Sequence, residues 1–89
     1  MRDFSIDERL EKILKKIYKK DRKTYDILIE KIKEIINVAN IAHYKNLRKP
    51  LQHLKRVHIQ KSFVLTFRYL EKEDKVIFYD FDHHNNIYK

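Results

Sequence analysis

The 89-residue chain contains no cysteine, no glycine, no tryptophan and only one proline. Without cysteine it can form no disulfide and no zinc–thiolate site, and it cannot use a thiol as a nucleophile. The absence of glycine, together with 38% charged residues, is compatible with a thermophilic source. The longest apolar runs are far too short to span a bilayer and we find no signal peptide, so we expect a cytoplasmic protein with no membrane partner.

Sequence motifs of several enzyme classes are also missing. The chain has no GxxxxGK[ST] phosphate loop, no dinucleotide-binding GxGxxG, no serine-hydrolase elbow and no HExxH zinc motif. These absences argue against nucleotide, acyl-transfer and zincin chemistry. Four possible metal ligands near the C-terminus lack any recognised spacing, so we expect neither a metal nor another cofactor: Asp80, Asp82, His83 and His84.

Positive charge is what the chain has in excess. It carries 21 Lys and Arg residues against 13 Asp and Glu, which gives a formal net charge of +8 and a pI near 9.7. Such an excess favours an anionic partner, either a nucleic acid, an acidic protein or an anionic membrane face. A lysine-rich surface can also serve solubility alone.

Two amphipathic helices are predicted in the N-terminal half. Ser5 can cap the first in a capping box with Glu8, and its apolar stripe consists of Ile6, Leu10, Ile13, Leu14 and Ile17. Asp21 interrupts this pattern and can cap the second helix, whose stripe consists of Tyr25, Leu28, Ile29, Ile32, Ile35 and Ile36. So short a turn predicts an antiparallel helical hairpin with one shared apolar face.

Three strands are predicted in the C-terminal half, over residues 54–60, 63–70 and 75–81, where apolar and polar residues alternate. We therefore predict an α+β fold, a single domain over residues 1–89. The N-terminal helical hairpin would pack on a small twisted antiparallel sheet of three to four strands, with residues 2–5 as a possible extra edge strand. The other face of the sheet would expose Arg56, His58, Gln60, Thr66 and Arg68.

Two histidines are placed where they could act on RNA. His58 lies, by alternation, on the polar face of its strand, and His84 lies just past the end of the last strand. If these strands are close in the sheet, one imidazole can take the proton of a ribose 2′-OH while the other protonates the leaving 5′-oxygen. A histidine on a strand is often only a surface residue, however, and one near a terminus often belongs to a solvated tail.

Cationic side chains and one aromatic side chain would complete such a site. Arg68 and Arg56 could stabilise the charge that builds on the phosphorane, and Tyr88 could stack on a base or donate a proton. We assign catalysis to four residues: His58, His84, Tyr88 and Arg68. We assign RNA binding to four others: Arg56, Lys55, Lys61 and Arg48.

The order of these pieces resembles the RelE/ParE superfamily of bacterial and archaeal toxins. The resemblance covers nearly the whole chain: the helical hairpin of 10–38, the link NLRKPL at 46–51, the strands RVHI at 56–59 and FVLTFR at 63–68, and the ending DHHNNIY at 82–88. It implies a type II toxin with an α+β fold. A RelE-like member of this superfamily is expected to cleave mRNA in the ribosomal A site without a metal. The resemblance also implies an acidic, partly helical, RelB-like antitoxin that blocks this activity.

The family's functional positions carry over only in part. His58 matches a histidine of the YafQ-like branch, His84 matches a position that is histidine in that branch and arginine in RelE, and Tyr88 matches the terminal aromatic residue. Three positions where family members place arginines hold other residues here: Val64, Asp80 and Asp82. The resemblance therefore also admits a ParE-like inhibitor of DNA gyrase, or a non-catalytic nucleic-acid-binding module of the same fold.

Overall fold

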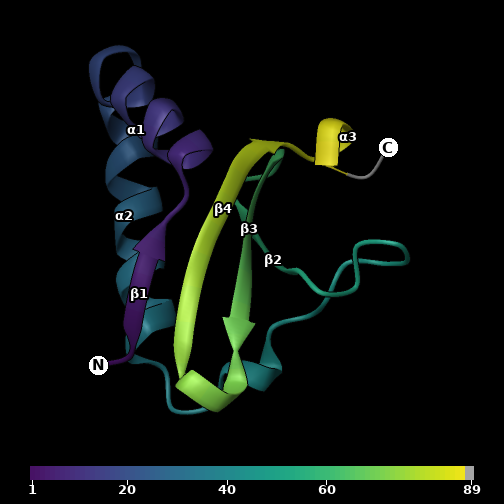
Figure 1. Cartoon of the computed structure of the whole chain (residues 1–89). Helices are drawn as coiled ribbons and strands as arrows, with labels where there is room; N and C mark the ends of the chain where they lie inside the picture. Colours follow the sequence, from purple (N-terminus) through teal and green to yellow (C-terminus); the bar gives the residue numbers. More distant parts are fainter. Residues whose placement is uncertain (88–89) are drawn as a thin grey trace.

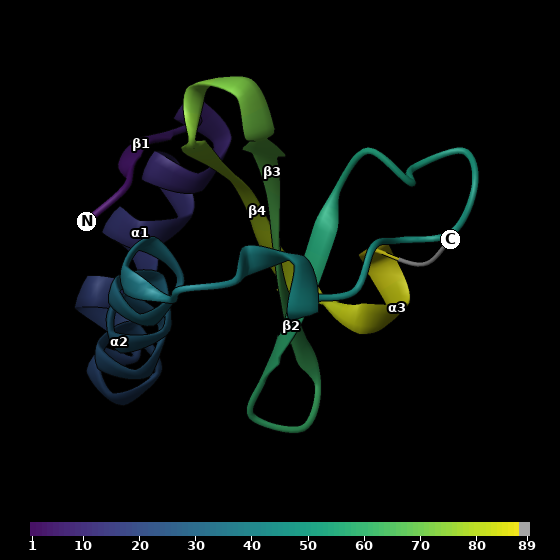
Figure 2. The same ribbon diagram turned by 90° about the horizontal axis from the view of Figure 1, so that it is seen from below.

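A computed structural model describes residues 1–87 of the chain (Figure 1). The elements, in chain order, are β1 (Asp3–Ile6), α1 (Glu8–Lys20), α2 (Arg22–Asn37), the 3-10 turn η1 (Ile41–His43), β2 (Lys55–Ile59), β3 (Phe63–Leu70), the 3-10 turn η2 (Glu71–Glu73), β4 (Lys75–His83) and α3 (His84–Ile87). The strands form one sheet in the order β1-β4-β3-β2. Figure 2 shows the helical hairpin on one side of this sheet, and the loop before β2 together with α3 on the other.

The predicted α+β architecture is confirmed, but the sheet is mixed rather than purely antiparallel. β2, β3 and β4 are antiparallel neighbours, whereas β1 runs parallel to β4, with Asp3 opposite Lys75 and Ile6 opposite Phe78. The backbone N–H of Asp7 donates to the carbonyl of Phe78 at 2.8 Å, which extends this pairing up to the start of α1. The chain thus passes straight from an edge strand into the helical layer, a connection compatible with parallel pairing.

The two helix starts differ in how well they were predicted. Asp7, not Ser5, caps α1, because its carboxylate accepts the backbone N–H of Arg9 at 3.0 Å while Ser5 lies within β1. The predicted capping box is therefore wrong. Asp21 caps α2 as predicted and accepts both the N–H and the hydroxyl of Thr24, at 3.1 and 2.6 Å. These hydrogen bonds from Thr24 hold the pKa of Asp21 below its ordinary value.

The main core lies between the helical hairpin and the sheet. Phe67 and Phe78 are fully buried at its centre and meet Leu10 of α1 and Leu28 and Ile35 of α2. Burial of a side chain of this size contributes about 1.5–3 kcal/mol to folding. The predicted apolar stripes supply the helical side of this core, except that Ile6 belongs to β1 and Tyr25 packs against Tyr18 instead.

β3 is also buried on its second face. Val64 and Thr66 are 0% and 2% exposed, and Leu47 and Leu54, in the segment leading into β2, are buried as well. The prediction that this face exposes Thr66 is wrong. Two segments, α3 and the loop that leads into β2, fold against the face of the sheet that lies away from the helices (Figure 2). Arg68 and His58 are exposed as predicted.

A β-bulge interrupts the pairing of β3 with β4. Thr66 lies opposite Asp80 and Phe67 lies opposite Phe78, so Tyr79 is an extra residue in β4. The bulge lets both Phe78 and Phe81, three residues apart, point into the core, where simple alternation would place them on opposite faces.

Arg2 joins the start of the chain to the end of α2. Its guanidinium donates to the carbonyls of Ile35, Val38 and Ala39, and its Nε lies 3.0 Å from Asp74 Oδ1. The Arg2 side chain is only 11% exposed. Since the last carbonyls of a helix have no partner within it, Arg2 provides the hydrogen bonds that α2 itself cannot.

We predict that Arg2→Met lowers the free energy of unfolding by about 2 kcal/mol, because it keeps the alkyl stem but leaves partly buried carbonyls without a donor. Arg68→Met, at an exposed position, is the matched control and should change stability by less than about 0.5 kcal/mol. Urea unfolding followed by circular dichroism measures both. Equal midpoints for the two variants would contradict this role of Arg2.

A second prediction concerns acid. The Tyr44 hydroxyl donates to Glu34 Oε2 at 2.7 Å, and this bond, with help from Lys31, keeps the pKa of Glu34 below its ordinary value of 4.5. A depressed carboxyl pKa gives stability that is present above pH 4.5 and lost as the pH falls through the folded-state value. Tyr44→Phe should therefore lower the urea midpoint more at pH 7 than at pH 3. Tyr79→Phe, at an exposed ring, should show no such difference, and a pH-independent loss in Tyr44→Phe would contradict the coupling.

Candidate functional site

The sheet face opposite the helical hairpin carries the polar residues that the sequence singled out. Residues directly opposite each other in neighbouring strands share a face. The register therefore defines two rows of side chains across β2, β3 and β4: His58–Val64–Asp82 and Arg56–Thr66–Asp80.

A cavity of about 500 Å³ lies at the β2 end of these rows. It is lined by residues 46–51 of the loop before β2, by Arg56 and His58 of β2, and by Ile87 of α3. Arg56 Nη1 lies 3.5 Å from His58 Nδ1, at the outer limit of a hydrogen bond. The cavity thus contains an imidazole next to a fixed positive charge.

The residues that line this cavity include three cations and no carboxylate. Between Glu34 and Glu71 the sequence has seven basic residues and no acidic one. Arg48 and Lys49 of the loop line the cavity, and both are exposed. Lys49 was missed as a candidate, although it stands beside Arg48 in this acid-free run.

His84 is fixed at the opposite edge of the site. Its backbone N–H donates to the Ser62 carbonyl at 2.8 Å, which ties the start of α3 to the turn between β2 and β3. Its ring stacks on His83 with centroids 4.7 Å apart, and His83 in turn packs on Phe63. Asp82 Oδ1 accepts the N–H of His83 and the side-chain amide of Asn86, at 2.7 and 3.1 Å. His84 is therefore held by the fold rather than carried on a free tail.

His58 and His84 lie at the same end of the sheet, with β3 between their strands. Two strand spacings separate the backbones of β2 and β4 by about 10 Å. Within residues 1–87, the ring contact found for His84 is with His83, and α3 contributes Ile87 rather than His84 to the cavity. A bound phosphate between the two strands could be flanked by both imidazoles, but they do not form a direct pair.

Two other candidates have positions that the sequence did not suggest. Arg68 is exposed but lies four residues along β3 from Val64, which corresponds to about 13 Å, so it is not beside His58. Lys55 Nζ donates to the Tyr44 carbonyl at 3.1 Å and to Asn46 Oδ1 at 3.0 Å. Lys55 thereby holds the loop in place.

The remaining candidates are Arg48, Lys61 and Tyr88. Arg48 lines the cavity and Lys61 is exposed in the turn between β2 and β3. Tyr88 lies outside the described residues. These three keep their status as predictions.

The three positions that lack a family arginine are accounted for locally. Val64 is fully buried, and Asp82 accepts the hydrogen bonds at the start of α3. Burial raises the pKa of Asp80 above its ordinary value. The backbone N–H of Phe81 and the guanidinium of Arg9 act in the opposite direction, with Arg9 Nη1 3.5 Å from Asp80 Oδ2. Arg9 comes from α1, and nothing in the sequence pattern links it to Asp80.

Two structural tests concern ligands and membranes. In the described part of the chain, no group of three or more His, Cys, Asp or Glu residues is arranged to hold a metal ion. Among residues 1–87, no helix combines the length and apolar character needed to cross a membrane.

Comparison of the sequence with known proteins gives two close relatives, although no family model matches. The chain is 52% identical over 89 residues to a protein of Methanocaldococcus jannaschii named "Putative toxin RelE4", covering all of this chain and 93% of that protein. It is 43% identical over 83 residues to an uncharacterized protein of Methanosarcina mazei, covering 93% of this chain and 94% of the relative.

Solved structures share the fold at low identity. The toxin in the intact E. coli RelBE toxin–antitoxin complex aligns with a TM-score of 0.72 at 15% identity, over 93% of this chain and 96% of that one. A metal-bound toxin from Helicobacter pylori gives 0.77 at 16% identity, over 98% and 99%. YafQ from E. coli gives 0.69 at 16% identity, over the whole of both chains.

The structural similarities at 15–16% identity show that the fold is shared. The 52% identity to the M. jannaschii protein over the full length of this chain shows that the two proteins have a common ancestor. The family that the motifs resembled is thereby confirmed. The chain belongs to the RelE family of toxins.

Proposed function

We propose that this protein is the toxin of a type II toxin–antitoxin system and that it cleaves mRNA on the ribosome. The observation that carries this proposal is the cavity lined by Arg56 and His58 together with Arg48 and Lys49, a lining that contains no carboxylate. Such a surface suits a polyanion, and the paired guanidinium and imidazole suit a phosphodiester. The reaction would be a transesterification through the ribose 2′-OH, without a metal.

Each group has a role in this scheme. His58 takes the proton of the 2′-OH, the 2′-oxygen attacks the adjacent phosphorus, and His84 protonates the leaving 5′-oxygen. Arg56, already 3.5 Å from His58, neutralises charge on the phosphorane, while Arg48 and Lys49 bind flanking phosphates. Tyr88 would stack on a base of the message.

The proposal includes dependence on the ribosome. His58 is exposed, and a whole strand separates β2 from β4, so the protein alone does not enclose a phosphate. A ribosome that holds the message in place would supply the missing orientation, which is worth many orders of magnitude in rate. Free RNA should accordingly be cut slowly.

Cleavage by histidine variants tests the mechanism. We expect His58→Gln and His84→Gln each to lower the rate of mRNA cleavage in a translating extract by about 10²–10⁴-fold, the usual contribution of a general acid or base. His53→Gln, at an exposed histidine outside the cavity, should cleave as the wild type does. Primer extension on the message maps the cuts, and intact mRNA with the wild type, or equal cleavage by His84→Gln, would refute the scheme.

A second candidate function is inhibition of DNA gyrase, as in ParE-like proteins. It is favoured by Val64, which is fully buried where RelE-like members place an arginine, so that no side chain from this position can reach a substrate. The same preparation should therefore be added to a gyrase supercoiling assay. Inhibition there, with mRNA left intact, would select this function over cleavage.

The proposal also assigns an acidic, partly helical, RelB-like antitoxin as partner. A RelE-fold toxin is paired with its antitoxin in the E. coli RelBE complex, and the cations that line the cavity, Arg48, Lys49 and Arg56, are complementary to an acidic segment.

Expression in cells tests this partner. Induction of the toxin alone should arrest growth, and co-expression with a short acidic reading frame from beside its gene should restore growth and yield a complex that co-purifies. Harmless expression of the toxin alone would contradict the assignment.

A further inference from the structure

A second cationic surface lies at the end of the helical hairpin. Residues 12–23 contain seven basic residues and one acidic residue. They form the last two turns of α1 and the start of α2, in the layer on the opposite side of the sheet from the cavity loop (Figures 1 and 2). Much of the excess positive charge therefore lies far from the candidate catalytic site.

Few of these cations are neutralised by neighbours. Lys12 pairs with Glu8 at 3.6 Å and Arg22 pairs with Asp26 at 3.3 Å. No ion pair is found in residues 1–87 for four others, all exposed: Lys15, Lys16, Lys19 and Lys20. The nearest carboxylate in sequence, Asp21, is used in capping α2.

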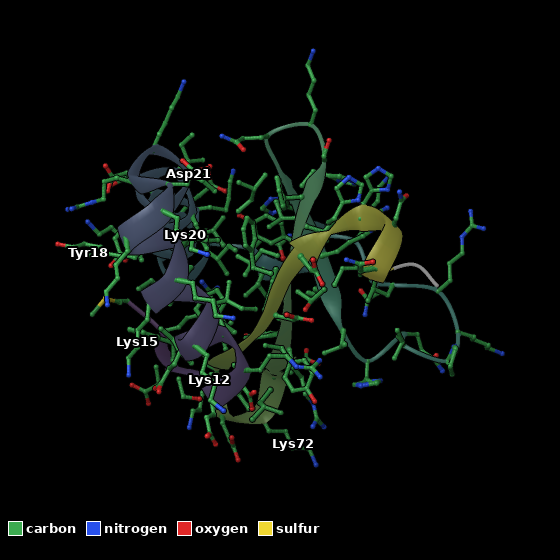
Figure 3. The ribbon with its side chains drawn as sticks, turned by 90° about the horizontal axis from the view of Figure 1, so that it is seen from above. Lys12, Lys15, Tyr18, Lys20, Asp21 and Lys72 are labelled. Atoms are coloured by element: carbon green, nitrogen blue, oxygen red, sulfur yellow. The ribbon has the colours of Figure 1, made fainter. Side chains whose placement is uncertain are left out.

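An aromatic ring stands among these lysines. Tyr18 is 47% exposed and points away from the sheet, between Lys15 and Lys20 on α1 (Figure 3). The Arg22 guanidinium lies 4.1 Å from the centre of its ring, and Tyr25 meets it edge-on with ring centroids 5.0 Å apart. These two contacts fix the ring in position, and because the guanidinium lies over one face of it, at most one face of the Tyr18 ring is left for a base.

A cavity of about 260 Å³ adjoins this ring. Its lining combines apolar and aromatic surface from Leu14, Tyr18 and Tyr25 with the side chains of Lys15 and Lys19. An apolar hollow with aromatic walls suits a nucleobase, and ammonium groups beside it suit the adjoining phosphates.

We infer that this surface, defined by Tyr18, Lys15 and Lys19, binds an unpaired nucleotide of RNA, with the base on Tyr18 and the phosphates on the two lysines. The assignment of that RNA to the ribosome rests on the proposed function. An acidic polypeptide would satisfy the lysines but would leave the aromatic hollow unused, so the ring favours RNA. The protein would then bind RNA on both sides of its sheet, because the cavity would bind the message and the hairpin would bind ribosomal RNA.

Fluorescence anisotropy with a labelled oligouridylate of 15 nucleotides tests this site without any need for cleavage. Lys15→Glu/Lys19→Glu should reduce the slope of log affinity against log salt by about 1.4, as expected for two lost phosphate contacts to a single strand. Tyr18→Leu should weaken binding about tenfold at fixed salt, whereas Tyr18→Phe should retain it. Lys33→Glu/Lys72→Glu makes the same charge change at exposed positions elsewhere and should leave the slope nearly unchanged.

Translating extract separates this inference from the proposed function. The hairpin variants should need more ribosomes for half-maximal cleavage with an unchanged maximal rate, while His58→Gln should lose rate and keep its affinity for the oligonucleotide. If the wild type cleaves nothing, the anisotropy series still decides whether the hairpin binds RNA.

Two results would overturn the inference. The first is equal affinity and salt slope for the Lys15/Lys19 variant and its control. The second is binding of poly-L-glutamate as tight as that of the oligonucleotide, with neither changed by Tyr18→Leu, which would assign the surface to an acidic protein. Far-UV circular dichroism checks that each variant is folded, and Lys15→Gln/Lys19→Gln replaces the charge reversal if that variant is not.

Discussion

The structure depends on the burial of one strand, β3, from both sides. Leu65 and Phe67 face the helical hairpin, while Val64 and Thr66 are shielded on the side of the cavity loop. In an 89-residue chain without cysteine, no disulfide can compensate for a small core, so a second buried face adds stability that one layer of helices does not supply. It also confines the polar chemistry to the margins of the sheet, where β2, α3 and the loop meet.

Charge is distributed in keeping with this layering. The cations that line the cavity and the lysines of the hairpin lie on opposite sides of the sheet, whereas many of the acidic residues stand at helix starts and in the turn between β3 and β4. Several of those carboxylates act locally, as Asp7 and Asp21 do in capping α1 and α2. A net charge of +8 thus corresponds to two separate surfaces that can each meet an anionic partner.

The sequence predicted what depends on local periodicity. The helical stripes, the cap at Asp21 and the bounds of β3 follow from the spacing of apolar residues and are confirmed. Alternation of polar and apolar residues predicts which face of the sheet a residue lies on, but it does not predict which segments cover that face. For this reason Thr66 was expected on the surface. The parallel pairing of β1 and the contact of Arg9 with Asp80 join residues about seventy positions apart, and no local pattern encodes them. For the site, exposure of His58 was predictable, but the use of Lys55 in holding the loop was not.

The extra residue in β4 has a bearing on the C-terminal histidines. Because Tyr79 is left unpaired, the pairing of β4 with β3 shifts by one residue beyond the bulge. His83 therefore lies opposite Phe63 and packs against it, and His84 is the residue that leaves the sheet beside Ser62. In a regular ladder, Asp82 would lie opposite Phe63 and His83 would occupy the exit. The bulge at Tyr79, well away from either imidazole, therefore decides which of two adjacent and chemically identical side chains is presented at the rim.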